Sequence, residues 1–333
     1  MAKRKFNFKF FLLFFGVTAI TLILAGVFYY YQIVLAPERN FRTGTQYMAS
    51  GDFDKAASYF GRSVSKKPTN MAYLNALQDA LLKIVPKSGS AANENYSKLI
   101  SVKLSKTRAA AQDSKVWVEA MESVRDRNEL FGGDMAWREF SATAMQMEKA
   151  LPLDDPQQAL AKFWKLQGFN ERYTALTPEE RDTLDKDFPV IVKLLPNNER
   201  VWLAYLEYLL VKADALERGN QKNMALETYR LFDAAIVECK KLNPQSIAAP
   251  ILLVQRLEGM KFRNEPGVKQ ADLDAAFKAI MDQAPRLAQD RKLTLAAAGA
   301  IFQGRSFEAN NKGMELLENR LKAFPNAAVL ISH

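Results

Sequence analysis

The sequence predicts an all-α protein built from repeated pairs of helices. Apolar residues recur at helical spacing along most of the chain, and no stretch alternates apolar and polar residues as a half-buried strand requires. Turn signals also recur at a nearly constant interval. Prolines at the expected turns lie 40, 48, 41 and 40 residues apart, namely Pro156, Pro196, Pro244, Pro285 and Pro325. A period of this length is typical of stacked helical repeats.

The N-terminus has the pattern of a membrane anchor. Residues 1–9 form a basic tail without acidic residues, and residues 10–36 carry no charge. A helix needs about 20 apolar residues to cross a bilayer, so this run is long enough to span and longer than the apolar core of a cleaved signal peptide. Tyr29, Tyr30 and Tyr31 fit the aromatic belt at the far interface. The alternative, a buried helix of a soluble protein, is disfavoured because the run has no polar face.

The charges on either side of this run predict its orientation. Basic residues that flank a span stay on the cytoplasmic side of the membrane. The tail carries four of them, whereas Arg39 and Arg42 follow the run on the other side. This modest bias predicts a single-pass protein of a bacterial inner membrane, with a cytoplasmic N-terminus and a periplasmic body.

The body carries little net charge once the tail is set aside. The chain has 46 Lys and Arg against 37 Asp and Glu, a net charge of +9. Four of the basic residues and none of the acidic ones lie in residues 1–36, so residues 37–333 hold 42 against 37 and a net charge of +5. No run of Lys and Arg is interleaved with aromatic residues, and the sequence therefore predicts no nucleic-acid partner.

Residues 38–70 show the clearest single repeat. Gly44 and Ala56 are small enough to let two helices approach each other closely. Tyr47 and Phe60 supply aromatic side chains at the spacing that fills the space between such helices. Each helix of the expected pair therefore has one small and one aromatic position on the same face.

Turn signals frame the second helix of this repeat. Gly51 tolerates the left-handed conformation and Asp52 can cap the next helix, while Pro68 ends that helix because its ring and missing N–H cannot continue it. Together with the glycine–tyrosine and alanine–phenylalanine spacings, this pattern resembles one tetratricopeptide repeat (TPR). The Trp and Leu of the family's pattern are replaced by Asn40 and Thr43. The resemblance implies a right-handed solenoid of helix pairs that binds proteins or peptides on a concave surface.

The rest of the body, within 37–333, is expected to continue the stack. Turn signals divide it into further helix pairs near 71–113, 114–155, 156–197, 198–244, 245–287 and 288–325. The string at 116–120 resembles that at 201–205, and each follows a boundary, which supports a repeated unit. A polar loop is expected over 86–95. The residues expected to pack between helices are Trp117, Trp137, Trp164, Trp202 and Cys239.

The C-terminus has the pattern of an open stack. Residues 323–326 resemble the end of one repeat, and residues 327–331 begin another apolar segment before the chain stops at His333. Solenoids usually finish with a polar cap. The pattern therefore predicts either a fragment of a longer protein or an open end that docks on a partner.

Few residues in this chain could carry chemistry. The only histidine is His333 and the only cysteine is Cys239, which excludes nucleophilic triads and zinc sites built on these residue types. No glycine-rich phosphate loop is present. The string 63–66 matches the S-x-x-K pattern, but its companion motifs are missing. The sequence predicts a protein that is not an enzyme, with no catalytic residue, cofactor or metal, although a hydrolase that uses two carboxylates stays open.

The sequence therefore predicts a membrane-anchored TPR scaffold that binds proteins or peptides and has no small-molecule substrate. Related domains that grip a carboxylate use Lys and Asn on their first helices, whereas this chain places Phe41 and Thr45 on that face. Phe41, Thr45 and Met48 are the candidate partner-binding residues, and packing against the second helix pair is the alternative for them. Two other functions stay open: a structural component of an envelope assembly or secretion/export complex, and the anchor region of a larger enzyme truncated after His333.

Overall fold

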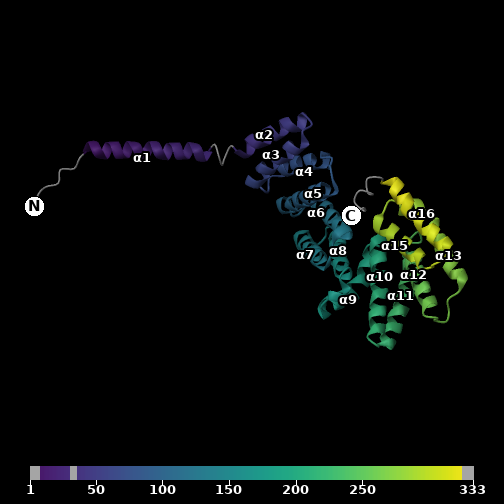
Figure 1. The fold of residues 1–333 in the computed structure, drawn as a ribbon. Coiled ribbons are helices and arrows are strands. Elements are labelled where there is room, and N and C mark those ends of the chain that lie inside the picture. The colour runs from purple at the N-terminus through teal and green to yellow at the C-terminus, as the bar shows by residue number, and fades with distance from the viewer. Residues whose placement is uncertain (1–7, 31–35, 325–333) are drawn as a thin grey trace, which may run out of the picture. The chain divides into compact units, whose positions relative to one another are not determined.

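The computed structural model describes residues 8–30 and 36–324 (Figure 1), and it describes the side chains of the first helix from Leu13 onward. These residues form sixteen α-helices and one short 3-10 helix and contain no strand, which confirms the predicted all-α class. Contacts along the chain define two compact units, residues 1–120 and residues 121–333.

Unit 1 holds the first helices of the chain. They are α1 (Phe8–Tyr29), α2 (Ala36–Ala49), α3 (Phe53–Lys66), α4 (Met71–Lys83) and α5 (Gly89–Ala109), and α6 (Ser114–Phe131) crosses into unit 2. Unit 2 continues with α7 (Asp134–Ala150), α8 (Gln158–Asn170), a 3-10 turn (Tyr173–Ala175), α9 (Pro178–Leu194), α10 (Glu199–Arg218), α11 (Lys222–Leu242), α12 (Ala248–Phe262), α13 (Gln270–Met281), α14 (Ala284–Leu287), α15 (Arg291–Phe302) and α16 (Phe307–Ala323).

The large apolar side chains of α1 are exposed from Leu13 onward. Among the described residues, no helix combines the length and the apolar character that crossing a membrane demands. The expected anchor at 10–36 extends beyond the described side chains, because residues 31–35 lie outside them. Residues 1–7 of the expected basic tail and residues 325–333 of the expected open end also lie outside the described residues.

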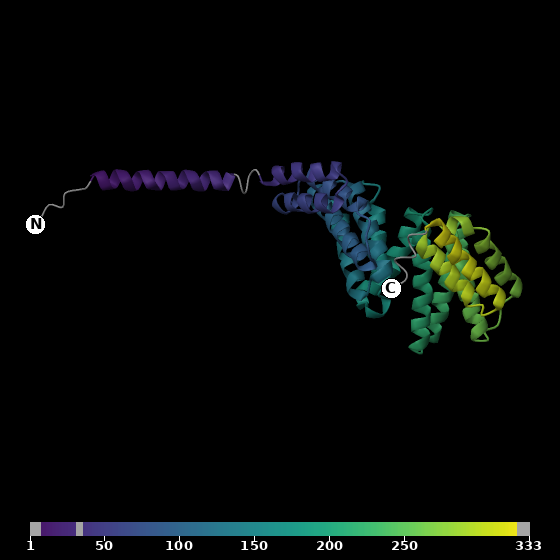
Figure 2. The same ribbon diagram turned by 45° about the horizontal axis from the view of Figure 1, so that its top comes forward.

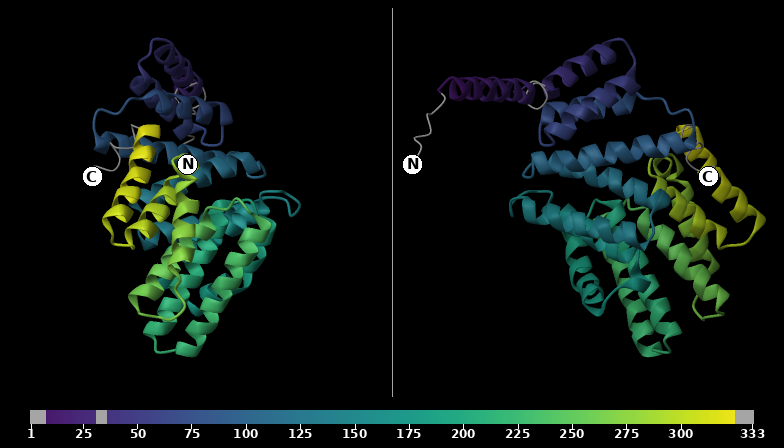
Figure 3. Two further views of the ribbon diagram at one scale, coloured as in Figure 1. Left: turned by 90° about the vertical axis from the view of Figure 1, so that its right-hand side faces the viewer. Right: turned by 60° about the vertical axis from the view of Figure 1, so that its left-hand side comes forward.

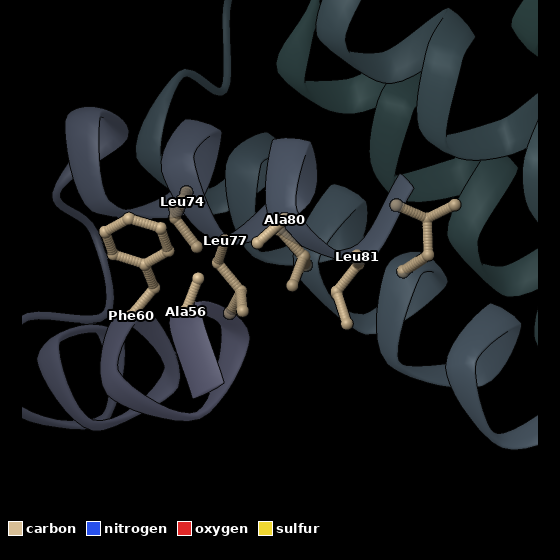
Figure 4. Packing of buried hydrophobic residues seen from close by; sticks show 8 residues of the cluster. Ala56, Phe60, Leu74, Leu77, Ala80 and Leu81 are labelled. Carbon is tan, nitrogen blue, oxygen red and sulfur yellow. The ribbon is translucent and has the colours of Figure 1, made fainter. Parts of the chain in front are cut away.

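The close approach of α2 and α3 depends on one glycine. A Cβ atom at Gly44 would lie 2.7 Å from the ring of Phe60, so a larger residue does not fit there unless its neighbours move. Ala56 and Phe60 are buried, and Figure 4 shows them directed at Leu74 and Leu77 of α4. The packing predicted for the glycine, the alanine and the phenylalanine is confirmed.

The turn between α2 and α3 also forms as the sequence predicts. Gly51 has a φ of 78°, a conformation that residues with side chains rarely adopt. The side chain of Asp52 accepts a hydrogen bond of 3.2 Å from the backbone N–H of Lys55 and caps α3. The helix ends at Lys66, shortly before Pro68.

The expectation of a polar loop over 86–95 is wrong. The helix α5 already begins at Gly89, because the side chain of Ser88 accepts a hydrogen bond of 3.2 Å from the backbone N–H of Ala91 and caps the helix. The side-chain amide of Asn95 donates to the carbonyl of Leu81 over 2.9 Å and holds the start of α5 against the end of α4.

Helices of unit 2 that are not neighbours along the chain contact one another in succession. Helix α8 packs against α10, α10 against α12, and α12 against α15. Neighbours along the chain pack as well, and Figure 3 shows α10 and α11 as a long antiparallel pair, while Figure 2 shows α15 beside α16. Because α10 has neighbours on several sides, its residues 201–206 and 208–210 are all buried.

The first turn of α10 anchors the start of α12. The Glu199 carboxylate accepts hydrogen bonds from the Ser246 hydroxyl at 2.9 Å and from the backbone N–H groups of Ile247 at 3.1 Å and Ala248 at 3.3 Å. A carboxylate placed at a helix N-terminus also complements the helix dipole. The guanidinium of Arg286, just after the start of α14, donates to the same carboxylate over 3.0 Å.

The four tryptophans are buried, as predicted, and so is Cys239, whose pKa burial raises to about 11. Two of the tryptophans each make the same kind of local hydrogen bond. The indole N–H of Trp117 donates to the carbonyl of Ala111 over 2.7 Å, and that of Trp202 donates to Pro196 over 2.8 Å. Both acceptors lie six residues before the tryptophan. The resemblance between the two sequence strings therefore reflects one local structure that occurs twice.

Two glycine-to-alanine substitutions are expected to change stability in opposite directions. Gly44→Ala forces a methyl group against Phe60 and should lower the free energy of unfolding by about 1–3 kcal/mol. Gly61 has open space at its Cβ position inside α3, so Gly61→Ala should raise the free energy of unfolding by about 0.5–1 kcal/mol. Denaturant unfolding followed by circular dichroism measures both, and equal effects would contradict the packing assigned to Gly44.

Candidate functional site

The three residues predicted to bind a partner all lie on helix α2, but they differ in their burial. Phe41 and Met48 are partly buried and pack against the core of unit 1. The ring of Phe41 lies 5.4 Å from that of Phe60 and 5.0 Å from that of Tyr73, measured between ring centroids. Thr45 is exposed, and its hydroxyl donates to the carbonyl of Phe41 over 3.0 Å. Of the three, only Thr45 presents an exposed side chain to solvent.

An open groove of about 980 Å³ lies elsewhere in unit 1, between α3 and α5. Its floor is formed by α4, through Leu77 and Leu81, and its end by the loop that follows α4. One wall is a single face of α3, made by Asp54, Ala57, Ser58, Gly61 and Val64. The other is a single face of α5, made by Ala91, Glu94, Asn95, Ser97, Lys98, Ser101, Val102 and Ser105. None of the predicted partner-binding residues on α2 lines this groove.

Small side chains make the walls of the groove smooth. The hydroxyls of Ser101 and Ser105 donate to carbonyls one turn earlier in α5, over 3.0 and 2.9 Å. With these bonds made, the serines need no further partner as donors, and they add little bulk to the wall. Gly61 leaves open space on the opposite wall. A long surface with an apolar floor and small walls suits another helix, because small residues let two helix backbones approach closely.

Charged residues mark the edge of the groove. Lys98 and Glu94 form an ion pair of 2.7 Å on α5, and Asp54 and Lys87 also line the edge. Both sides of the Glu94–Lys98 pair are exposed, so it contributes little to stability. These groups therefore place charge of both signs at the edge of the groove at little energetic cost to the fold.

The spacing of the two walls was visible in the sequence. Residues 54, 57, 58, 61 and 64 recur at three- and four-residue intervals, as do residues 91, 94, 98, 101 and 105. Most members of both sets are either small or polar, as is typical of the solvent face of an amphipathic helix. That the two faces flank one groove follows only from the packing of α4 between α3 and α5.

A second cavity, of about 490 Å³, lies in unit 2 and is lined by charged residues. The ammonium of Lys292 on α15 lies 2.9 Å from a carboxylate oxygen of Glu171 and 4.0 Å from one of Glu207. At its margin the Glu129 carboxylate receives the guanidinium of Arg200 at 2.5 Å and that of Arg291 at 3.4 Å. The hydrogen bond from Arg291 to Glu129 joins residues that are 162 positions apart in the chain.

The Glu207 carboxyl beside Lys292 does not titrate as a free acid. Burial raises the pKa of Glu207 above its ordinary 4.5, and the negative charges of Glu171 and Glu129 add to this against the opposing charge of Lys292. Burial would lower the pKa of Lys292, but attraction to Glu207 and Glu171 outweighs it and the pKa is raised. The Lys292 ammonium thus lies beside two carboxylates and is closer to that of Glu171, at 2.9 Å, than to that of Glu207, at 4.0 Å.

Neither cavity contains the arrangement that metal binding requires. Within the described parts of the chain, no group of three or more His, Cys, Asp or Glu side chains is placed to hold a metal ion. The S-x-x-K string has a structural role at its serine, because the buried hydroxyl of Ser63 donates to the carbonyl of Pro37 over 2.8 Å. That bond joins the end of α3 to the start of α2.

Comparison of the chain with models of known protein families gives no match, and comparison with curated proteins gives none either.

Removing the charge of Glu207 is expected to stabilise the protein at neutral pH. Because its folded-state pKa lies above the unfolded value, protonated Glu207 contributes stability that is present in acid and lost as pH rises through the folded pKa. Glu207→Gln cannot ionise and keeps that contribution. Its thermal midpoint should exceed that of the wild type at pH 7, and the difference should shrink toward pH 4.

Glu180 provides a control of the opposite sign. Burial would raise the pKa of Glu180, but hydrogen bonds from the Arg172 guanidinium and the Thr177 backbone outweigh it and the pKa is lowered. Its stability contribution is therefore present at neutral pH and lost as pH falls. Glu180→Gln should lower the thermal midpoint at pH 7, and a loss of the same size in Glu207→Gln would contradict the assignment of Glu207.

Proposed function

We propose that this protein is a membrane-anchored, TPR-like helical scaffold that binds a partner protein through the groove between α3 and α5. The observation that carries the proposal is the groove itself, an open surface of about 980 Å³ with an apolar floor and small-residue walls. The occupant that fits best is an amphipathic helix of the partner. Helix-in-groove binding places an apolar helix face on such a floor and leaves the polar face at the edge.

The size of the groove agrees with this occupant. A helix with its side chains is roughly 10–12 Å across and rises 5.4 Å per turn, so one turn fills roughly 400–600 Å³. The volume of about 980 Å³ therefore matches about two turns of helix. Leu77 and Leu81 would contact the apolar face, and Lys98 and Asp54 would lie beside its polar flanks.

Two observations support a repeat architecture for the scaffold. The hairpin of α2 and α3 has the small and aromatic residues, the turn and the terminal proline that resemble a TPR. In unit 2, α10 contacts α8 and α12, and α12 contacts α15, in the manner of successive helix pairs of a solenoid. A stack of this kind is largely formed before binding, so little ordering entropy is lost when a partner docks.

The membrane anchor is proposed from the uncharged run of residues 10–36. This run extends on both sides beyond the side chains that the structure describes. With the basic tail in the cytoplasm, the body lies in the periplasm.

In spheroplasts of a bacterial host, external protease should remove a C-terminal tag from the full chain. Cleavage only after the cells are lysed would contradict this orientation.

Filling the groove is expected to abolish partner binding without unfolding the chain. Gly61→Trp projects a large side chain into the open space of the groove wall. Proteins that co-purify with the tagged full chain from membranes should be lost from this variant, as quantified by mass spectrometry.

Gly299→Trp is the matched control for this experiment. Gly299 also lies within a helix, α15, is exposed and has open space at its Cβ position, but it does not line the groove. It should retain the wild-type partners. Loss from both variants, or from neither, would count against the groove, provided circular dichroism shows both to be folded.

A further inference from the structure

Positive charge is distributed unevenly between the two units of the body. Residues 37–120 contain 13 Lys and Arg against 7 Asp and Glu, a net charge of +6. Residues 121–333 contain 29 against 30, a net charge of −1. The excess positive charge of the body therefore lies entirely in the part that follows the proposed anchor directly.

Within unit 1, exposed basic residues gather at one end of the α2–α3 hairpin. This near end consists of the first two turns of α2, the last two turns of α3 and the residue after α3. It carries five exposed basic residues, Arg39, Arg42, Arg62, Lys66 and Lys67. The one acidic residue there is Glu38, whose carboxylate is already engaged by Lys67 at 2.5 Å. The opposite end of the hairpin carries Asp52 and Asp54 with Lys55.

Three segments of the chain are held together at the near end. The Ser63 hydroxyl donates to the carbonyl of Pro37 over 2.8 Å, which fixes the end of α3 beside the start of α2. The Tyr73 hydroxyl of α4 donates to Glu38 over 3.1 Å. The hydrogen bonds from Lys67 and Tyr73 hold the pKa of Glu38 below its ordinary value, although burial opposes them. The helix ends that carry the basic residues are therefore held in fixed positions relative to one another.

Chain connectivity brings the near end to the membrane surface. The helix α2 begins at Ala36, where the proposed anchor ends, so Arg39 and Arg42 follow the bilayer within a few residues. At 1.5 Å per residue, Arg42 lies about 9 Å along the helix from Ala36. This distance is about one Debye length at physiological salt, whereas the far end of α2 lies about 20 Å away. With α2 directed away from the bilayer, the near end lies within reach of the headgroup charge and the far end lies beyond it.

We infer that the near end of the hairpin docks on anionic lipid headgroups. This contact would set the orientation of unit 1 relative to the bilayer and its distance from it. This inference rests on the proposed anchor. The lipid recognised is an anionic phospholipid, because clustered basic residues next to a membrane span are attracted to a negative surface. Such docking would keep the groove between α3 and α5 at a constant height above the bilayer.

Lysine reactivity in lipid nanodiscs tests the inference with the full chain. Lys67 and Lys55 form a matched pair, since each is exposed and each bonds one carboxylate, Glu38 at 2.5 Å and Asp52 at 2.8 Å. In discs that contain phosphatidylglycerol, an amine-acylating reagent should modify Lys66 and Lys67 about threefold more slowly than in phosphatidylcholine discs, whereas Lys55 should react alike in both. Salt at 0.5 M should remove the difference, since screening is then stronger.

Two results would overturn the inference. Equal reactivity of Lys66 and Lys67 in the two kinds of disc means that the near end does not touch anionic lipid. An equal slowing of Lys55 means that the charge effect is not specific to the near end. Carbonate extraction of the chain from liposomes distinguishes a failure of the proposed anchor from a failure of the lipid contact. A chain that carbonate releases lacks the anchor on which both claims rest, whereas a chain that stays inserted without lipid-dependent protection overturns this inference alone.

Discussion

A glutamate in the first turn of a helix ties that helix to later parts of the chain in each unit. In unit 1, Glu38 at the start of α2 receives Lys67 from the end of α3 and Tyr73 from α4. In unit 2, Glu199 at the start of α10 receives the first backbone N–H groups of α12 and the guanidinium of Arg286. The surrounding helices bury apolar faces that carry no direction of their own. These carboxylates add directional bonds where helix ends meet. The buried Glu199 can specify which ends meet, whereas the exposed Glu38–Lys67 pair contributes little to stability.

The groove and the basic near end both follow from this arrangement in unit 1. Because α3 is fixed beside α2 and packs on α4, its remaining face borders the groove. The same fixation brings the basic last turn of α3 beside the first turn of α2. The proposed partner-binding groove and the proposed lipid-binding end therefore belong to one framework. A lipid contact at one end would orient the groove without any change in its shape.

Local signals in the sequence predicted much of the fold, and long-range pairing accounts for what they missed. Gly44, Phe60 and Asp52 act over a few residues or across one hairpin, so their roles could be inferred from spacing. The serine that caps α5 was also a local signal, but the polar composition of 86–95 obscured it. Glu199 resembles an ordinary first-turn acid, and its partners lie 44 to 87 positions away. The groove could not be predicted in this way, because no residue pattern shows that α3 and α5 flank α4.

The most direct measurement is photocross-linking in cells from single positions of the full chain. A photoreactive residue at Ser58 or Ser101 lies on the groove walls, and one at Thr45 lies on α2, where the family resemblance places the binding surface. All three positions are exposed, so access alone does not distinguish them. If the groove binds the partner helix, Ser58 and Ser101 should give the same adduct and Thr45 none. An adduct from Thr45 alone, or none from either wall, would contradict the role of the groove.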